Sequence, residues 1–201
     1  MSGLAGIYCR NQQARAYSGT IERMLRSIQH RGVHRSVLSG CGNVILGINH
    51  PHFVSLSDQC THDVERGLSV VLDGELFHIS DEDFSYEKDL TDPQIILNLY
   101  EKYGEGFLDK VDGTFAFALY DTPRDQLILG RDRLGAKPLF YFAPGDIMVF
   151  SSEIKAITCS DLVEKRVNLQ SVNNFFSFGY VPNPDTMFES IRSEEHTSEL
   201  Q

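Results

Sequence analysis

The sequence predicts an α+β protein with two facing, mostly antiparallel sheets and helices on their outer sides. Sequences typical of hairpin turns outnumber the strand–helix–strand crossovers that a parallel sheet needs. The run Thr114–Tyr120 is apolar on both faces, which indicates a strand covered from both sides. With 201 residues, 41% of them hydrophobic, the chain is long enough to bury the core of one such domain.

The strands are predicted from short apolar runs that end at turn-forming residues. Turn compositions at Asp121–Asp125 and at Ala143–Asp146 predict that the strands on either side form hairpins. The predicted strands are Leu4–Cys9, Asn43–Asn49, Leu68–Phe77, Thr114–Asp121, Gln126–Arg131, Leu139–Ala143 and Ile147–Ser151.

Helical periodicity marks three further segments. Ile21–Gln29 carries its apolar residues on one face. A second helix begins at Asp92-Pro93, where Asp92 fits the N-cap and Pro93 the first helical position. The third helix covers Leu169–Phe178.

Charge and cysteine usage exclude several classes of protein. The net charge of -10 predicts no basic face for nucleic acid or an anionic membrane. No apolar run approaches the length of a membrane span, and no signal peptide precedes Ser2. The cysteines are scattered without a CxxC motif, which favours reduced thiols in a cytoplasmic protein. His50 and His52 suggest a metal pair, but no further ligands accompany them, so no metal site is predicted.

Ser2 is the first candidate catalytic residue, because it follows Met1 and precedes an apolar, glycine-bearing strand. Removal of Met1 would leave a hydroxyl and a free α-amine on one residue. An α-amine has a pKa of about 8 and can act as general base for its own side chain, as in N-terminal-nucleophile hydrolases. Serine is also common after an initiator methionine, so the alternative is that Ser2 has no catalytic role.

Residues 192–201 resemble the translation of a short-read sequencing adapter. We therefore expect the domain to cover residues 1–191, the text from Ser193 onward to be non-native, and a downstream portion to be missing.

Seven segments match one known family in its own order: Gly3–Ile7, His30–Gly32, Asp73–Phe77, Gly113–Asp121, Arg131–Tyr141, Ser151–Ala156 and Phe178–Glu189. Together they resemble the N-terminal glutamine amidotransferase domain of asparagine synthetases. The resemblance implies a four-layer αββα sandwich that hydrolyses the side-chain amide of glutamine and passes ammonia to a linked synthetase domain. ATP and magnesium would bind only in that second domain, whose Ser-Gly-Gly loop is absent from this sequence. The resemblance is also compatible with a homodimer.

The catalytic residues that the resemblance implies are altered. Ser2 stands where the family has its nucleophilic cysteine, and a hydroxyl needs a stronger base than a thiol. Asp73-Gly74-Glu75 replaces Asn-Gly-Glu, in which the asparagine amide and the glycine N–H form the oxyanion hole. Such a donor is worth about 3 kcal/mol, and an ionised aspartate cannot donate. The alternative for Asp73 is a turn residue at the end of a strand.

The implied substrate pocket is altered as well. His50 stands where the family has an arginine that clamps the α-carboxylate of glutamine, and neutral histidine offers no such fork. Glu75 and Asp92 match positions that contact the α-amine, although a helix cap explains Asp92 equally well. Val33 and His34 replace a proline and an aspartate in the loop over the pocket.

These substitutions suggest three hypotheses. In the first, the glutaminase site is impaired and the domain is retained as a structural platform for an asparagine-synthetase-like ligase. In the second, Ser2 is a working nucleophile that hydrolyses glutamine or another small amide. In the third, the chain is a free-standing binding or regulatory module.

Overall fold

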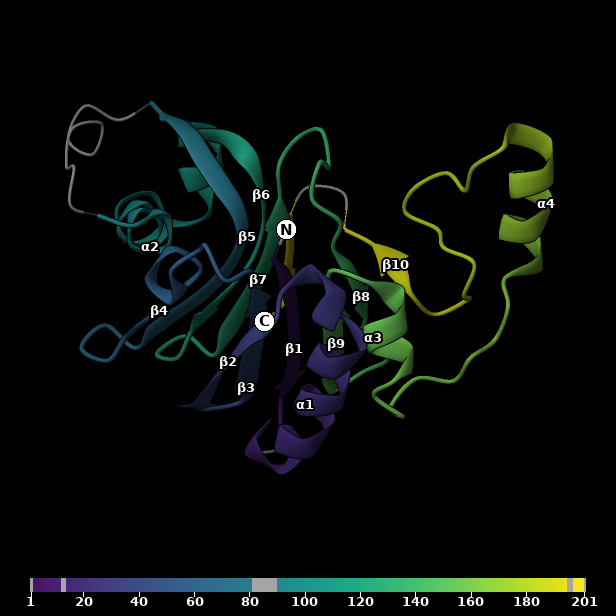
Figure 1. Cartoon of the computed structure of the whole chain (residues 1–201), viewed down its shortest axis with the longest axis horizontal. Coiled ribbons are helices and arrows are strands. Elements are labelled where there is room, and N and C mark those ends of the chain that lie inside the picture. Colours follow the sequence, from purple (N-terminus) through teal and green to yellow (C-terminus); the bar gives the residue numbers. More distant parts are fainter. Residues whose placement is uncertain (1, 12–13, 81–89, 195–196, 201) are drawn as a thin grey trace.

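Two antiparallel sheets pack face to face, with helices on their outer sides (Figure 1). The computed structural model describes residues 2–11, 14–80, 90–194 and 197–200, and only the main chain of residues 39–41 and 197–200. The two sheets and their outer helices confirm the predicted α+β sandwich.

The first sheet has the strand order β10-β8-β9-β1-β3-β2, and the second has the order β11-β7-β6-β5-β4. The strands of the first sheet are β1 (Gly3–Cys9), β2 (His34–Cys41), β3 (Val44–His50), β8 (Phe140–Phe142), β9 (Ile147–Ser151) and β10 (Arg192–Ser193). The second sheet contains β4 (Cys60–Asp63), β5 (Leu68–Ile79), β6 (Val111–Asp121), β7 (Gln126–Arg131) and β11 (Thr197–Leu200).

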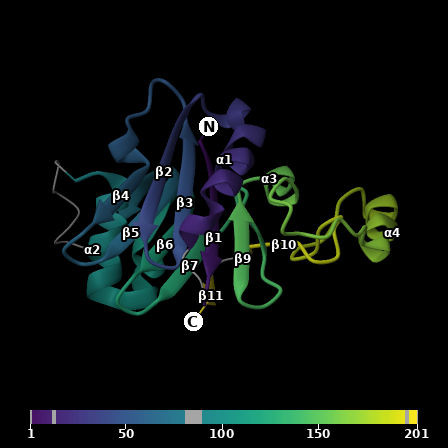
Figure 2. The same ribbon diagram turned by 90° about the horizontal axis from the view of Figure 1, so that it is seen from below.

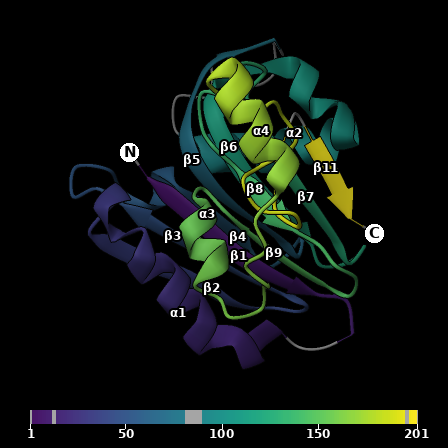
Figure 3. The ribbon, with the colours of Figure 1, turned by 90° about the vertical axis from the view of Figure 1, so that its right-hand side faces the viewer.

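The helices α1 (Ser18–Ser27) and α3 (Ile154–Thr158) lie beside the first sheet, and α2 (Asp92–Tyr103) lies beside the second (Figure 3). The helix α4 (Leu169–Phe178) stands apart from both sheets in two perpendicular views (Figures 1 and 2). The 3-10 turns are η1 (Ala14–Tyr17), η2 (Gln29–Arg31), η3 (Leu56–Asp58) and η4 (Gly104–Lys110). Among the described helices, none has the length and apolar composition needed to cross a bilayer.

Alternation along the strands divides the core into layers, because successive side chains of a strand point to opposite faces. In β1, Leu4 and Tyr8 pack between the sheets, whereas Ala5 and Ile7 pack toward α1. In β5, Val71 packs between the sheets, and its neighbours in sequence pack toward α2. The result is the expected order of helix, sheet, sheet and helix.

The seven predicted strands are all present, and the predicted turns at 121–125 and 143–146 do close the β6–β7 and β8–β9 hairpins. The third predicted helix matches α4, but the first begins at Ser18 and ends at Ser27, earlier than predicted. The strands β2 and β4 and the helix α3 were not predicted. Their sequences are short or largely polar, so hydrophobic periodicity does not mark them.

The N-cap of α2 was wrongly predicted. Thr91 occupies the cap position and forms a capping box with Gln94, whose side chain accepts a hydrogen bond from the Thr91 N–H at 2.9 Å. Asp92 is therefore the first helical residue, and its carboxylate can serve another purpose.

The segment after Ile191 contributes β10, paired with β8, and β11, paired with β7. Such pairing joins main-chain groups and needs no particular side chains. The interpretation of residues 192–201 as non-native text stays a prediction.

Gly74 interrupts the side-chain pattern of β5, with a φ of 135° and its α-carbon against the main chain of β6. A β-carbon at this position would collide with the carbonyl oxygen of Thr114. We expect Gly74→Ala to lower the free energy of unfolding by about 3 kcal/mol, measured by urea denaturation. The control is Gly179→Ala, at a φ of 81° in open space, which should cost about 1–2 kcal/mol. Equal costs for the two variants would contradict the close approach of β5 and β6.

Candidate active site

Ser2 lies immediately before β1 and is 5% exposed. Ser2 is an even number of positions from Leu4 and Tyr8, whose side chains pack between the sheets. The alternation of side chains along the strand therefore directs the Ser2 side chain into the same space. Arg31, at the end of η2, donates from Nε to the carbonyl oxygen of Ser2 at 2.7 Å. This buried hydrogen bond fixes the start of β1.

Asp73 lies within β5 and is completely buried, so the alternative interpretation as a turn residue at a strand end is wrong. It shares the inter-sheet face with Val71. Asp73 Oδ2 accepts from Arg31 at 2.9 Å, and Oδ1 accepts from Lys137 Nζ at 3.2 Å. Both carboxylate oxygens are thus engaged by cations. We call Arg31, Asp73 and Lys137 the ion triad.

The Arg31 guanidinium also faces Glu153, with Nη1 3.5 Å from Oε1. His30 Nε2 donates to the same oxygen at 2.7 Å, and Lys155 Nζ lies 3.2 Å from Oε2. Burial alone would raise the pKa of Glu153, but hydrogen bonds from Lys155 and His30 outweigh it and hold the pKa below its usual value. Glu153 therefore remains an anionic partner for Arg31.

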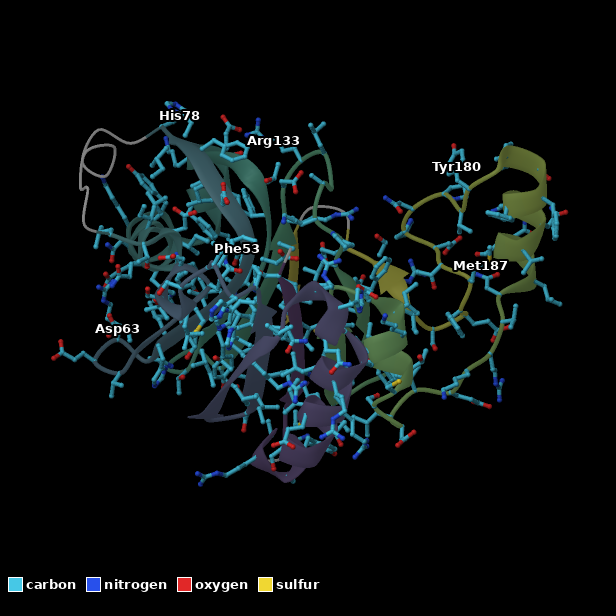
Figure 4. All side chains as sticks on the ribbon, viewed as in Figure 1. Phe53, Asp63, His78, Arg133, Tyr180 and Met187 are labelled. Carbon is cyan, nitrogen blue, oxygen red and sulfur yellow. The ribbon has the colours of Figure 1, made fainter. Side chains whose placement is uncertain are left out.

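A cleft of about 720 Å³ opens beside the ion triad. It brings together five of the six predicted site residues: Ser2, Asp73, Gly74, Glu75 and Asp92. Its other lining residues are Pro51, Phe53, Val54, Asp58, Gln59, Leu90, Thr91 and Lys137. Phe53, labelled in Figure 4, lies on the chain segment that joins β3 to β4, and the residue is 86% exposed.

His50 is the predicted site residue that does not line the cleft. Its Nδ1 shares a hydrogen bond of 3.1 Å with the carbonyl oxygen of Val54, and its ring stacks on His34 at 5.5 Å between centroids. His34 in turn shares a hydrogen bond of 2.7 Å with His52. Within the described residues, neither these rings nor any other side chains form a group of three or more metal ligands.

Asp92 faces the cleft from the first turn of α2, where its Oδ2 accepts from the Leu76 N–H at 2.9 Å. Burial raises the pKa of Asp92, and the negative charges of Glu75 and Asp58 raise it further, against the opposing effect of that hydrogen bond. The carboxylates of Glu75 and Asp58 are therefore close enough to Asp92 to disfavour its ionised form.

Sequence reasoning missed the roles of Arg31, Lys137, Asp58 and Gln59. Arg31 and Lys137 enter the sequence analysis only as parts of the family motifs His30–Gly32 and Arg131–Tyr141. One signal was available. An aspartate inside an apolar strand has to be paired when it is buried, so Asp73 itself calls for a cation.

Comparison with known proteins identifies the family. The model of the glutamine amidotransferase domain matches residues 1–199. The chain belongs to this family. It is 29% identical to asparagine synthetase [glutamine-hydrolyzing] 3 of Bacillus subtilis (strain 168), over 96% of this chain and 33% of the relative. It is 32% identical to the amidase chyE of Penicillium rubens, over 78% of this chain and 26% of the relative.

The chain thus spans a third or less of the length of these curated relatives. Among solved structures, it resembles the glutamine phosphoribosylpyrophosphate amidotransferase of B. subtilis in complex with ADP and GMP, with a TM-score of 0.57 and 17% identity. That match covers 83% of this chain and 45% of the other. At this identity it supports the fold, an N-terminal-nucleophile-type sandwich, and nothing finer.

The ion triad predicts strong coupling between Arg31 and Asp73. We expect Arg31→Met to cost about 3 kcal/mol of unfolding free energy, because it leaves a buried carboxylate short of one partner. In an Asp73→Asn background the same change should cost at least about 1.5 kcal/mol less, measured by a double-mutant cycle in urea. The exposed pair Arg23 and Asp161 serves as control, with an expected coupling below about 0.5 kcal/mol. Equal coupling in the two cycles would contradict the ion triad.

The raised pKa of Asp92 predicts a pH-dependent penalty. Between the ordinary value of 3.8 and the raised native pKa, the folded state binds more protons than the unfolded state. The stability contribution of Asp92 therefore falls as pH rises through this window. We expect the stability gain from Asp92→Asn to grow between pH 4 and neutrality. Urea midpoints should show no such trend for the exposed control Asp109→Asn. A gain that shrinks with rising pH would show that the carboxylate is stabilised rather than strained.

Proposed function

We propose that this amidotransferase domain has an impaired glutaminase site and is retained as a folded platform for an asparagine-synthetase-like, ATP-dependent amide ligase. The ion triad carries the proposal. Asp73 occupies the position where the family pattern has an oxyanion-donating asparagine, and both of its oxygens accept from cations. Loss of one such donor costs about 3 kcal/mol in the transition state, or roughly two orders of magnitude in rate.

The nucleophile adds to this loss. Ser2 supplies a hydroxyl in place of the family's thiol, and it would depend on its own α-amine as base after removal of Met1. Gly74 still borders the cleft, so its N–H can supply the remaining half of an oxyanion hole. The proposed impairment therefore comes from the altered side chains at residues 2 and 73 and not from a blocked cleft.

The platform role is supported by the contrast between scaffold and site. The hydrophobic layers between and outside the sheets are fully formed, while two of the altered residues, Ser2 and Asp73, line the cleft. In the proposed whole protein, a linked synthetase portion binds ATP and magnesium, activates a carboxylate by adenylation and takes ammonia or an internal amine as acceptor. We propose a cytoplasmic location and a homodimer as part of the same account.

An active serine hydrolase is the second candidate, and one observation favours it. Ser2 borders an open cleft in which Lys137 places a cation near the side chain of Asp73. A cation at this point can partly replace the missing amide donor. The two candidates differ in one property, turnover that depends on Ser2.

Glutamate release from L-glutamine separates them. With an N-terminal Ser2 confirmed by mass spectrometry, we expect the protein and its Ser2→Ala variant to release glutamate at the same background rate. Ser2→Cys alone should stay within about tenfold of background, because residue 73 still cannot donate. Addition of Asp73→Asn and His50→Arg should raise the rate by a further tenfold or more. Robust turnover that disappears in Ser2→Ala would instead establish the hydrolase.

The reading frame beyond Ile191 at the native locus tests the ligase part. Continuation into a nucleotide-binding loop with a Ser-Gly-Gly sequence would support the platform role. A stop codon soon after Ile191 would leave a stand-alone hydrolase or binding module.

A further inference from the structure

Three histidine rings stand in a row beside the cleft. His34 is the first residue of β2 and His50 is the last residue of β3, and the two face each other in the register of the sheet. Their rings stack with centroids 5.5 Å apart, and the ring of His52 stacks on His34 at 4.9 Å. His50 is buried, whereas His34 and His52 are exposed and can exchange protons with solvent. We call these three side chains the histidine row.

The histidine row holds a turn that forms part of the cleft wall. In this turn, which covers residues 51–54, the Val54 N–H donates to the carbonyl oxygen of Pro51 at 3.1 Å. Pro51, Phe53 and Val54 line the cleft. His50 is bonded to the carbonyl oxygen of Val54, and His52 within the turn is bonded to His34 on β2. The position of this wall therefore depends on two tethers from the histidine row.

The two tethers respond differently to protonation. A carbonyl oxygen only accepts, so His50 Nδ1 donates to Val54 at 3.1 Å whether the ring is neutral or charged. Between His34 Nε2 and His52 Nδ1, which are 2.7 Å apart, one nitrogen donates and the other accepts. The pair accommodates one added proton, because an imidazolium N–H can donate to a neutral ring. When both rings are protonated, both nitrogens carry hydrogen and no acceptor remains.

The electrostatics of the row add to this loss. His50 is an even number of positions from Leu46 and Ile48, so the row lies on the face of β3 that looks toward the second sheet. Two positive charges on stacked rings 4.9 Å apart repel each other, which drives the rings apart once both are protonated.

The charged groups on the neighbouring elements act in both directions. Arg35 lies near Asn49 on the opposite face of the sheet, with its Nε 3.4 Å from Asn49 Oδ1, and Arg31 is engaged with Asp73. The titratable and charged groups on the elements packed here are Arg35 on β2, His30 and Arg31 on η2, Asp58 on η3, and Asp73 and Glu75 on β5. The carboxylates favour the first added proton, but none of them restores the acceptor that the second proton removes.

We propose that the histidine row is a pH-sensitive switch in the cleft wall. Near neutral pH the bond between His34 and His52 holds the turn of residues 51–54 against β2, and double protonation toward pH 5 releases it. Histidine is the side chain whose charge changes in this range. The tether from His50 to Val54 persists, so the released turn remains attached at one end. The switch goes beyond the proposed function, because it applies equally to a working and to an impaired site.

The test follows the turn by NMR at pH 7.5 and at pH 5. The NOE between the ring protons of His34 and His52 reports the tether, and the heteronuclear NOEs of the His52 and Phe53 amides report the mobility of the turn. We expect the ring-to-ring NOE to fall at least fivefold at pH 5 and the two amide values to fall with it. The amide signals of β3 and β6 should stay dispersed at both pH values, which verifies that the sheets remain folded.

Three variants identify the titrating pair. His52→Asn places a side-chain oxygen near the position of Nδ1, and this acceptor does not titrate, so we expect the turn to stay ordered at pH 5. His34→Phe keeps a stacked ring without nitrogen, so the turn should be mobile at both pH values. His78→Gln replaces an exposed histidine on β5, labelled in Figure 4, and should behave like the parent.

A ring-to-ring NOE that persists in the parent at pH 5 would overturn the inference. Release by acid in His52→Asn, or a pH-dependent mobility of the turn in His34→Phe, would overturn it as well, because the titrating group would then lie elsewhere. None of these measurements involves glutamine turnover, so failure of the switch and failure of the proposed function are distinguishable.

Discussion

A fully buried carboxylate between two cations joins the parts of this molecule that form the cleft. Asp73 brings the middle of β5 into contact with Arg31 from η2 and with Lys137 from the turn after β7. Arg31 also holds the carbonyl oxygen of Ser2 and faces Glu153. Because removal of one partner would leave a charge buried without compensation, the ion triad constrains the position of every segment it touches.

The turn that presents Lys137 depends on a second buried aspartate. Asp132 accepts hydrogen bonds from the main-chain N–H groups of Leu134 and Ala136 through Oδ1 and from that of Lys137 through Oδ2. These hydrogen bonds hold the turn in the conformation from which the Lys137 side chain forms its ion pair with Asp73. The two ion pairs give Asp73 a structural role in which both of its carboxylate oxygens act as acceptors. Under the proposed function, the contacts that stabilise the cleft are also the ones that keep residue 73 from donating to an oxyanion.

Much of the fold could be predicted from the sequence, because the strands with apolar alternation and the hairpin turns carry local signals. The strand β4 carries almost none: Cys60 is its one buried residue. The cap of α2 was misplaced by one residue, since Thr91, Asp92 and Pro93 all fit a helix start, and only the contact between Thr91 and Gln94 decides among them.

For the site, the family pattern located Ser2, Asp73, Gly74, Glu75 and Asp92, and the structure gathers these on one cleft. The partners of Asp73 and the buried amide of Gln59 could not be predicted in this way. Arg31 lies 42 positions from Asp73, and Lys137 lies 64 positions away. Such pairings arise from the packing of the two sheets, so no periodic pattern of residues in the sequence indicates them. The burial of His50 outside the cleft lining likewise depends on the path of the chain from His50 to Val54.

A crystal structure of the protein grown with a large excess of L-glutamine tests the central claim most directly. The account predicts that Asp73 keeps Arg31 and Lys137 as its partners and that no glutamine carboxamide oxygen lies within hydrogen-bonding distance of its side chain. A glutamine bound with that oxygen against residue 73, and with Asp73 turned away from the two cations, would contradict the account.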